Sequence, residues 1–188
     1  MKELEITVKV NSSYEKLHSD LERIGFKKTK QTIMYDTYMI DKNIDISNMN
    51  DLDILSKCII VRSVDDYNAF IYKIKEYDEF ENIVSQKKIE CKIDDINSGI
   101  KFMEMINYKE LLNIKSELIF YSNNDLDILV QIVNDSFILI EMEDENFDNI
   151  QDMINAFSKL DIDYDKSNYF VKKAQIILRG KGGINVCR

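Results

Sequence analysis

The sequence predicts an α+β protein built on an antiparallel, closed or nearly closed β-barrel of about eight strands with helices outside. Three observations support this fold class. Hydrophobic and polar residues alternate with a period of two in several short segments, as they do in half-buried strands. Short turns join most of these segments, which favours antiparallel pairing. The order strand, helix and three strands occurs twice, over about 1–77 and 87–144, which indicates a weak internal repeat.

The first half opens with a strand over 3–10, in which apolar residues such as Ile6 and Val8 alternate with polar ones. A helix follows, with Ser12 and Glu15 in a capping-box pattern and Gly25 placed to end it. A loop rich in Asn and Asp and a turn at 65–68 separate the strands that come next. These strands are expected at about 33–41, 58–64 and 69–77.

The second half is expected to hold a strand at 87–93 and a helix at about 95–107. Asn134 and Asp135 form the tight turn of its last strand pair. Its remaining strands are expected at about 114–121, 127–133 and 137–144. Two helices close the chain, at about 148–160 and 167–178, and Ser167 is the expected N-cap of the second.

The composition favours one folded domain. The chain has 188 residues, 45% of them hydrophobic, which is enough to bury a core. It has no proline and five glycines, so no flexible linker is evident. We therefore expect a single domain over 1–178 and a flexible tail over 179–188, where three of the glycines lie.

The charge and the cysteines limit the partners and the compartment. A net charge of −9 disfavours nucleic acid but allows a phosphate ligand in a local basic pocket. No apolar run approaches the ~20 residues of a membrane span, and the N-terminus lacks the apolar core of a signal peptide. The three cysteines form no CxxC pair, which argues against a disulfide framework or a zinc site. A cytoplasmic protein that binds neither membrane nor nucleic acid is expected.

Charged residues recur at period two within the apolar strands, and this is the informative feature. One interpretation is a sheet with one solvated face, which is common. The other is a barrel interior in which carboxylates hold Mg²⁺ or Mn²⁺ and cations bind phosphate. The residues concerned are Glu3, Glu5, Arg62, Lys73, Lys75, Lys88, Glu90, Lys115, Glu117, Glu141 and Glu143.

Short motifs in these strands follow a recognisable order along the chain. They are Glu3-Leu4-Glu5-Ile6-Thr7, Asp36-Thr37-Tyr38, Ile60-Val61-Arg62, Tyr72-Lys73, Lys88-Ile89-Glu90, Lys115-Ser116-Glu117, Glu141-Met142-Glu143 and Ser167-Asn168-Tyr169. This ordered set resembles the CYTH, or triphosphate tunnel, family over about 3–170. Each motif alone is weak, but together they agree with the strands and helices expected above.

The resemblance implies a tunnel-like barrel and a metal-dependent activity on a triphosphate. The family includes class IV adenylyl cyclases, thiamine triphosphatases and inorganic triphosphatases. It implies that the small-molecule partner is a nucleoside, thiamine or inorganic triphosphate, and a homodimer is a further expectation. Catalysis would fall to Glu3, Glu5, Arg62 and Lys73. Substrate would be bound by Arg62, Lys73, Lys75, Lys88 and Lys115. Mg²⁺ or Mn²⁺ would be held by Glu3, Glu5, Glu141, Glu143 and Glu90.

Several positions depart from the family pattern. Thr7, Ile60 and Glu117 stand where the family has cations, and its later aspartate falls at Gln131 or Asp127. Each lost cation could cost about 2–4 kcal/mol of transition-state stabilisation. The residues that could substitute are Lys9, Lys75 and Lys92. Two alternatives therefore stay open, namely a catalytically weak phosphate- or nucleotide-binding module and an unrelated α+β interaction domain.

Overall fold

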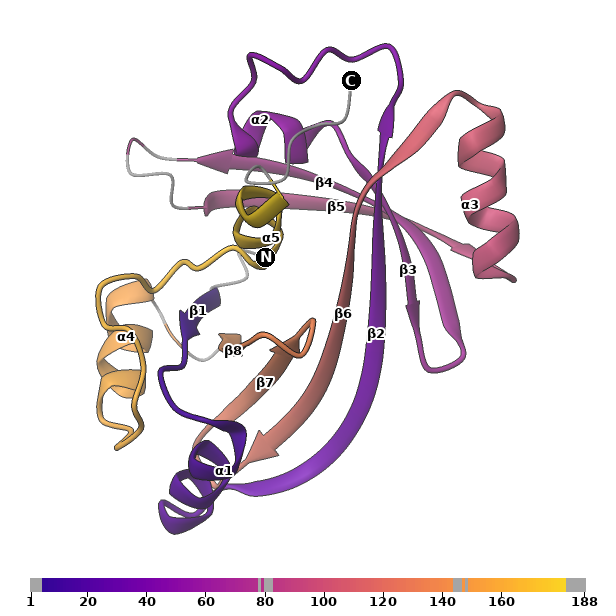
Figure 1. Cartoon of the computed structure of the whole chain (residues 1–188). Coiled ribbons are helices and arrows are strands. Elements are labelled where there is room, and N and C mark those ends of the chain that lie inside the picture. The colour runs from indigo at the N-terminus through magenta and orange to yellow at the C-terminus, as the bar shows by residue number, and fades with distance from the viewer. Residues whose placement is uncertain (1–4, 78, 80–82, 144–146, 148, 182–188) are drawn as a thin grey trace. The chain divides into compact units, whose positions relative to one another are not determined.

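In the computed structural model the described residues are 5–77, 79, 83–143, 147 and 149–181. The chain forms two compact units, each made of separate stretches of sequence. Unit 1 comprises Met1–Ile33 and Ser116–Val171, and unit 2 comprises Met34–Lys115 and Lys172–Arg188. Strands β2 (Lys27–Asp41) and β6 (Tyr108–Ser122) contribute residues to both units (Figure 1).

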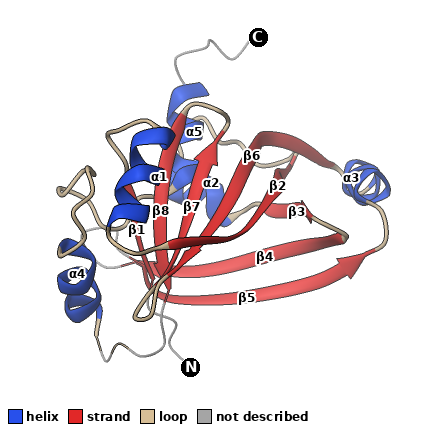
Figure 2. Cartoon of the chain, turned by 90° about the horizontal axis from the view of Figure 1, so that it is seen from below, coloured by secondary structure: helices blue, strands red, loops and turns tan. Residues whose placement is uncertain are grey.

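Eight strands form one sheet in the order β1-β8-β7-β6-β2-β3-β4-β5 (Figure 2). Besides β2 and β6 they are β1 (Glu5–Lys9), β3 (Ile59–Val64), β4 (Tyr67–Tyr77), β5 (Ile83–Ile93), β7 (Asp127–Val133) and β8 (Phe137–Glu143). The registers of β1–β8, β8–β7, β7–β6, β2–β3, β3–β4 and β4–β5 are all antiparallel. The predicted α+β class and the number of strands are confirmed. Within the described residues the sheet runs from β1 to β5 without a pairing that joins these two ends.

Unit 1 packs two helices against the apolar face of its strands. Helix α1 (Tyr14–Arg23) buries Leu17 and Leu21, and α4 (Ile150–Ser158) buries Met153 and Phe157. These side chains join a core cluster with the inward residues of the strands, among them Ile6, Val8, Ile119, Val130, Ile140 and Met142. Burying such side chains contributes about 1.5–3 kcal/mol each. The alternating apolar residues of the sequence therefore define this core.

A segment near the end of unit 1 runs along the second edge of β1. The amide of Thr7 donates to the carbonyl of Tyr169 at 2.9 Å, and the amide of Val171 donates to the carbonyl of Thr7 at 3.0 Å. Farther along β1, the amide of Asp165 donates to the carbonyl of Lys9 at 2.8 Å. These bonds fix β1 from both sides, because β8 pairs with its other edge.

Unit 2 is built on β3, β4 and β5 with α3 (Ile96–Met105) on one face of the strands. Met103 of α3 packs with Met39 and Val61 in a second core cluster. Gly99 lets the helix approach closely, since a Cβ there would lie 2.4 Å from Cδ1 of Ile93. The unit also contains α2 (Asp51–Ser56) and α5 (Lys173–Lys181), which are joined by an ion pair between Arg179 and Asp51 at 2.7 Å.

Several element boundaries differ from the sequence-based prediction. Helix α1 is capped by Ser13, whose side chain accepts from the amide of Lys16, and not by Ser12. Helix α5 begins at Lys173, because Ser167 bonds to Asp165 in a turn before it. Helix α2 was predicted as loop. Strands β2 and β6 are longer than predicted, since their polar ends show no clear alternation with apolar residues.

The predicted hairpin turn at Asn134 and Asp135 is confirmed. Both residues have positive φ, 49° and 52°, as the turns that match strand twist require. Gly25, also at positive φ, follows α1 where the sequence placed the end of that helix. The predicted tail over 179–188 lies outside the described residues except for 179–181, which belong to α5. Among the described residues, no helix is long and apolar enough to cross a membrane.

Candidate functional site

Three of the predicted glutamates share one face of β1 and β8 in unit 1. Glu5 is the register partner of Glu143, and Thr7 is the partner of Glu141. Ile140 and Met142, which alternate with Glu141 and Glu143 along β8, belong to the core cluster. Because side chains alternate along a strand, Glu5, Glu141 and Glu143 lie on the face away from that core. Glu3, which the sequence places with them, lies outside the described residues.

Two neutral side chains hold these carboxylates. The hydroxyl of Thr7 donates to Oε1 of Glu5 at 3.3 Å. The Nε2 of Gln131 donates to Oε2 of Glu141 at 2.7 Å. Gln131 is 3% exposed, so its amide orients the carboxylate of Glu141 from a buried position. Gln131 stands at one of the two positions where the family aspartate was expected, and a glutamine within an apolar strand was the sequence signal for it.

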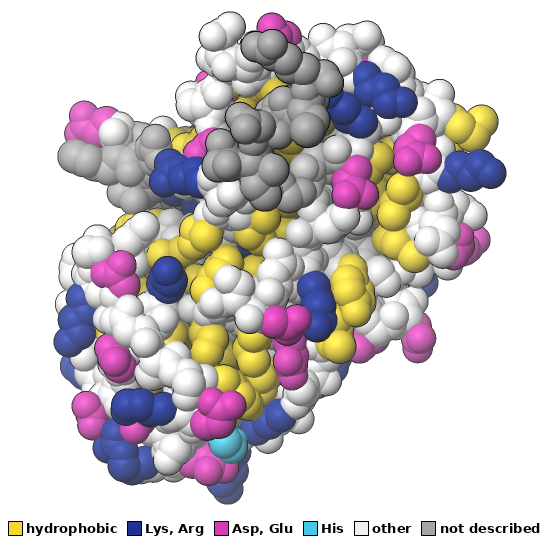
Figure 3. Space-filling view, in the orientation of Figure 1, with side chains coloured by type: hydrophobic (Ala, Val, Ile, Leu, Met, Phe, Trp, Pro, Cys, Tyr) yellow, Lys and Arg dark blue, Asp and Glu magenta, His cyan; other side chains and the backbone are white. Residues whose placement is uncertain are grey.

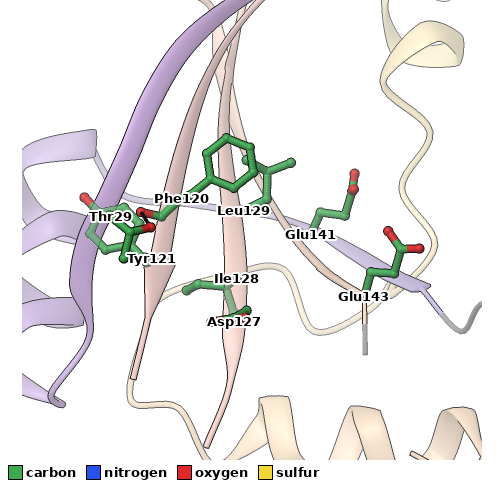
Figure 4. A pocket seen from close by; sticks show the side chains of 8 residues that line it. All are labelled: Thr29, Phe120, Tyr121, Asp127, Ile128, Leu129, Glu141 and Glu143. Atoms are coloured by element: carbon green, nitrogen blue, oxygen red, sulfur yellow. Dashed lines mark hydrogen bonds between the residues drawn. The ribbon is translucent and has the colours of Figure 1, made fainter. Parts of the chain in front are cut away.

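A hollow of about 270 Å³ opens beside these residues (Figure 4). Glu141 and Glu143 project to the same side of β8, and Phe120 lies next to Leu129 (Figure 4). The lining consists of Thr29, Phe120, Tyr121, Asp127, Ile128, Leu129, Glu141 and Glu143. Small-molecule sites usually span about 300–1,000 Å³, so the hollow falls just below that range and has room for one end of a ligand.

The carboxylates of unit 1 match the ligand type of Mg²⁺ and Mn²⁺, which prefer oxygen. Register partners such as Glu5 and Glu143 have Cβ atoms about 4.5–5.5 Å apart, close enough for both carboxylates to reach one ion. Within the described part of the chain, however, no three Asp, Glu, His or Cys side chains are already gathered around a common point. The residues therefore fit a divalent metal in donor type and spacing, and their side chains would have to turn toward it.

The predicted cations lie on one face of β3, β4 and β5 in unit 2. The register places Arg62 opposite Ala69, which is opposite Lys92. Farther along β4 the register pairs are Ile71 with Glu90, Lys73 with Lys88, and Lys75 with Gln86. Directly paired residues share a face and side chains alternate. The predicted residues on this face are thus Arg62, Lys73, Lys75, Lys88 and Glu90.

Arg62 is already engaged by a carboxylate. Its Nε donates to Oδ1 of Asp36 and its Nη2 to Oδ2, both at 2.7 Å. The Asp36 side chain is 0% exposed and that of Arg62 21%. Burial alone would lower the pKa of Arg62, but the hydrogen bonds and charge of Asp36 raise it overall, with smaller help from Tyr38 and Glu90. Arg62 is therefore a fixed, charged group whose side chain is not fully buried.

Glu90 belongs to this second face. Its Oε2 forms an ion pair with Nζ of Lys88 at 3.0 Å. The predicted metal ligands are thus distributed over both units, with Glu5, Glu141 and Glu143 in unit 1 and Glu90 in unit 2. Over the face of the molecule shown in Figure 3, acidic and basic side chains are interspersed, which agrees with the mixed signs seen along the strands.

The expectation that Lys115 and Glu117 share the face of Glu141 is wrong. Glu117 pairs with Ile132, whereas the next residue, Leu118, pairs with Gln131. Glu117 therefore lies on the face opposite to Gln131 and accepts from Nε2 of Gln31. Lys115, two residues earlier in β6, falls on the same side as Glu117. Period-two counting did not reveal this, because the neighbours Leu118 and Ile119 are both buried. Apolar residues therefore occur on both faces of this part of β6, and the sequence does not show which face Glu117 shares.

Two of the three positions where the family has cations and this sequence does not are filled in different ways. Thr7 is 6% exposed and uses its hydroxyl on Glu5. Ile60 is buried opposite Tyr38 and Ile71, where it adds to the apolar packing of unit 2. Neither position leaves a charged side chain on the face that carries the predicted residues.

Comparison with known proteins shows likeness in structure only. No family model matches the chain, and no curated protein matches it. The Hippeastrum protein HpAC1, a candidate adenylyl cyclase with a dominant triphosphatase activity, is 13% identical with a TM-score of 0.65 and covers 95% of both chains. A candidate adenylate cyclase from Vibrio parahaemolyticus is 9% identical with a TM-score of 0.63, covering 95% of this chain and 98% of its own.

A third structure with a similar fold is not described as a cyclase or triphosphatase. A chain of the Schizosaccharomyces pombe Mediator head module is 11% identical with a TM-score of 0.53, covering 85% of this chain and 91% of its own. At such identities the likeness establishes the fold and leaves the activity open. The chain therefore has a CYTH-like fold, as its resemblance to that family implied.

Proposed function

We propose that this protein is a metal-dependent phosphohydrolase that acts on a triphosphate. The observation that carries the proposal is the register of β1 and β8, which sets Glu5 directly opposite Glu143 with Glu141 on the same face. Like charges placed opposite each other on paired strands destabilise a sheet. A divalent cation between them would reverse that effect, because oxygen ligands of opposite charge suit Mg²⁺ and Mn²⁺.

The face of unit 2 supplies the groups that a polyphosphate requires. Lys73 and Lys88 are register partners, Lys75 lies two residues along β4, and Arg62 lies on the same face of β3. Opposed cations favour an anion for the same reason that opposed carboxylates favour a metal. Arg62 keeps its charge through Asp36 and can offer its remaining N–H groups to phosphate oxygens.

Each group has a defined part in the hydrolysis. A bound Mg²⁺ or Mn²⁺ would neutralise phosphate charge and make the terminal phosphorus easier to attack. Glu5, Glu141 and Glu143 would hold it, with Gln131 keeping Glu141 in place. The lysines of unit 2 carry positive charge of the kind that binding a polyphosphate requires. One water is consumed, the terminal P–O bond breaks, and orthophosphate and diphosphate are released.

The structural neighbours support a triphosphate as substrate. One of them is described by its dominant triphosphatase activity and another as a candidate adenylate cyclase. Hydrolysis and cyclisation differ in the nucleophile, which is water in the first and the ribose 3′-hydroxyl in the second. The alternative activity for this chain is therefore a class IV adenylyl cyclase-like reaction, which releases diphosphate and a cyclic product.

A second candidate function is phosphate or nucleotide binding with little turnover. Two observations favour it: Arg62 is committed to Asp36, and Ile60 is a buried residue where the family places a cation. A chain of the Mediator head module has the same fold within a multiprotein assembly. A protein of this kind would still bind a divalent metal through the carboxylates of unit 1 or a polyphosphate through the cations of unit 2.

A product assay with matched variants separates these functions. Tripolyphosphate, thiamine triphosphate and ATP are each incubated with the protein, with Mn²⁺ or with EDTA, and orthophosphate, diphosphate and cyclic nucleotide are measured. Orthophosphate release that needs Mn²⁺ and is lost in Glu5→Gln and Glu143→Gln supports the hydrolase. The control is Glu104→Gln on the exposed side of α3, which should retain the activity. Thermal stabilisation by tripolyphosphate without products supports the binding module, and neither products nor stabilisation would refute both.

A further inference from the structure

Strand β5 is the last strand of the sheet and is unusually open. Every residue from Lys87 to Lys92 is exposed. No strand of the described residues pairs with its outer edge. An edge of this kind presents backbone N–H and C=O groups that can pair with another chain, and monomeric proteins usually protect such edges.

The face of β4 and β5 that α3 covers continues beyond the helix with exposed apolar side chains, and Lys87 lies among them as the register partner of Ile74. Phe70 and Ile93 of these strands pack under α3. Farther along the same face Tyr72 is 37% exposed, Ile74 45% and Ile89 61%. Tyr72 and Ile89 are register partners and so form one apolar row across the two strands. Apolar side chains that stand together at a sheet edge are typical of a protein contact.

We propose that the occupant of this edge is a second copy of the chain, which pairs β5 with β5 in antiparallel orientation about a two-fold axis at Ile89. The arrangement would extend the sheet from one copy to the other and satisfy the edge of β5 in both. It is isologous, because each copy uses the same residues, and it is therefore closed at two copies. The inference does not depend on the proposed function.

The charges of β5, together with its apolar row, select this register. Paired residues must share a face, so a two-fold axis has to pass through a residue paired with its own copy. An axis at Ile89 sets Lys88 opposite Glu90 of the second copy, twice. An axis at Lys88 would oppose two lysines, and an axis at Glu90 would oppose two glutamates. Of these three arrangements, only the one at Ile89 pairs opposite charges. An axis at Cys91 would also pair opposite charges, Glu90 with Lys92 of the second copy, but it would set Ile89 opposite Ile93, which already packs under α3.

The same register also continues the rows of side chains on both faces. On the apolar face the order across four strands becomes Tyr72, Ile89, then Ile89 and Tyr72 of the second copy. On the charged face Lys88 is flanked by Lys73 in its own copy. Glu90 of the second copy would then offset the repulsion between these two lysines. The charged face thus allows the axes at Ile89 and at Cys91, and the apolar row favours the axis at Ile89.

Analytical ultracentrifugation over a range of protein concentrations tests the proposal with a charge swap. The wild type should show a reversible monomer–dimer equilibrium. Lys88→Glu and Glu90→Lys should each weaken dimerisation, on the order of tenfold or more, because each opposes like charges twice. The double variant Lys88→Glu with Glu90→Lys should restore the dimer, since it exchanges the partners. Matched controls are Lys101→Glu and Glu104→Lys, on exposed positions of α3, which should leave the equilibrium unchanged.

Two outcomes would overturn the inference. One is a wild type that stays monomeric at all concentrations, and the other is a dimer that is insensitive to both single charge reversals. Far-UV circular dichroism of each variant checks that it is folded. A second measurement uses Ile89→Cys in a background with Cys91→Ser and Cys187→Ser. A short thiol-to-thiol crosslinker should join two copies at position 89, and failure to crosslink a protein that still dimerises would place the axis elsewhere.

Discussion

Replacing Asp36 with alanine should lower the free energy of unfolding by about 3–5 kcal/mol, because it leaves the guanidinium of Arg62 without its partner in a mostly buried place. Two charge-assisted hydrogen bonds of 2.7 Å are lost, each worth about 1.5–3 kcal/mol. Since the Arg62 side chain keeps 21% exposure, water can hydrate part of the charge. We therefore expect a value in the lower half of the range.

Urea denaturation followed by far-UV circular dichroism measures this loss, since the chain has no tryptophan for fluorescence. Asp36→Asn should cost less than Asp36→Ala, because one acceptor oxygen remains. The control is the double variant Asp36→Leu with Arg62→Met, which removes both charges and should lie near the wild type or above it. A loss below about 1 kcal/mol in Asp36→Ala would refute the reasoning, since removing one partner of a buried ion pair costs about 3–5 kcal/mol.

The same variant also reports on phosphate binding. If Arg62 contacts phosphate, tripolyphosphate should restore part of the stability lost in Asp36→Ala, because the anion replaces the missing carboxylate. Arg62→Met should then lose stabilisation by tripolyphosphate. Equal stabilisation of wild type and Arg62→Met would remove Arg62 from the substrate-binding residues.

Three further predictions concern single side chains. Gln131→Leu should weaken Mn²⁺ binding about tenfold or more in isothermal titration calorimetry, because the donor that orients Glu141 is lost; unchanged affinity would contradict this role. Hydrogen bonds from the amide and the hydroxyl of Ser98 lower the pKa of Asp95 from 3.8, so the stabilising effect of this cap is present above pH 3.8 and is lost as the pH falls through the lower folded value. Asp95→Asn should therefore lose less melting temperature than the wild type in that pH window. An identical loss in both proteins would refute the assignment. Gly99→Ala should be tolerated better when Ile93→Val removes the Cδ1 atom at 2.4 Å, and melting temperatures that are additive for the two changes would argue against the contact.

Much of the fold follows from residue periodicity. Alternation in β1 and β7 and the turn at Asn134 placed these elements correctly, because each strand has one buried face and each turn residue a specific conformation. Helix α2 was missed since it has six residues, too few to show a helical period. The start of α5 was misplaced because Ser167 forms a local turn, and a serine has the same hydrogen-bonding ability in a turn as at a helix N-cap.

The candidate site was predictable only where the alternation of charged and core residues showed which face of the strand each side chain lies on. Glu141 and Glu143 alternate with core residues, so their face could be assigned from the sequence. Glu117 could not, because its face depends on the pairing of β6 with β7, which a single strand does not encode. The bond between Asp36 and Arg62 joins two residues that are 26 positions apart in the sequence. The family resemblance pointed to both residues, but only the register brought them into contact.

The central claim is that the glutamates opposed on β1 and β8 bind a divalent cation. The direct test compares the free energy of unfolding of wild type and Glu143→Gln, in EDTA and in Mn²⁺. In EDTA the variant should be more stable by about 0.2–1 kcal/mol, because a like-charge pair is removed. In Mn²⁺ the order should reverse, since only the wild type keeps both carboxylates for the ion. If Mn²⁺ stabilises the two proteins equally, or stabilises neither, the proposed metal site on this face is contradicted.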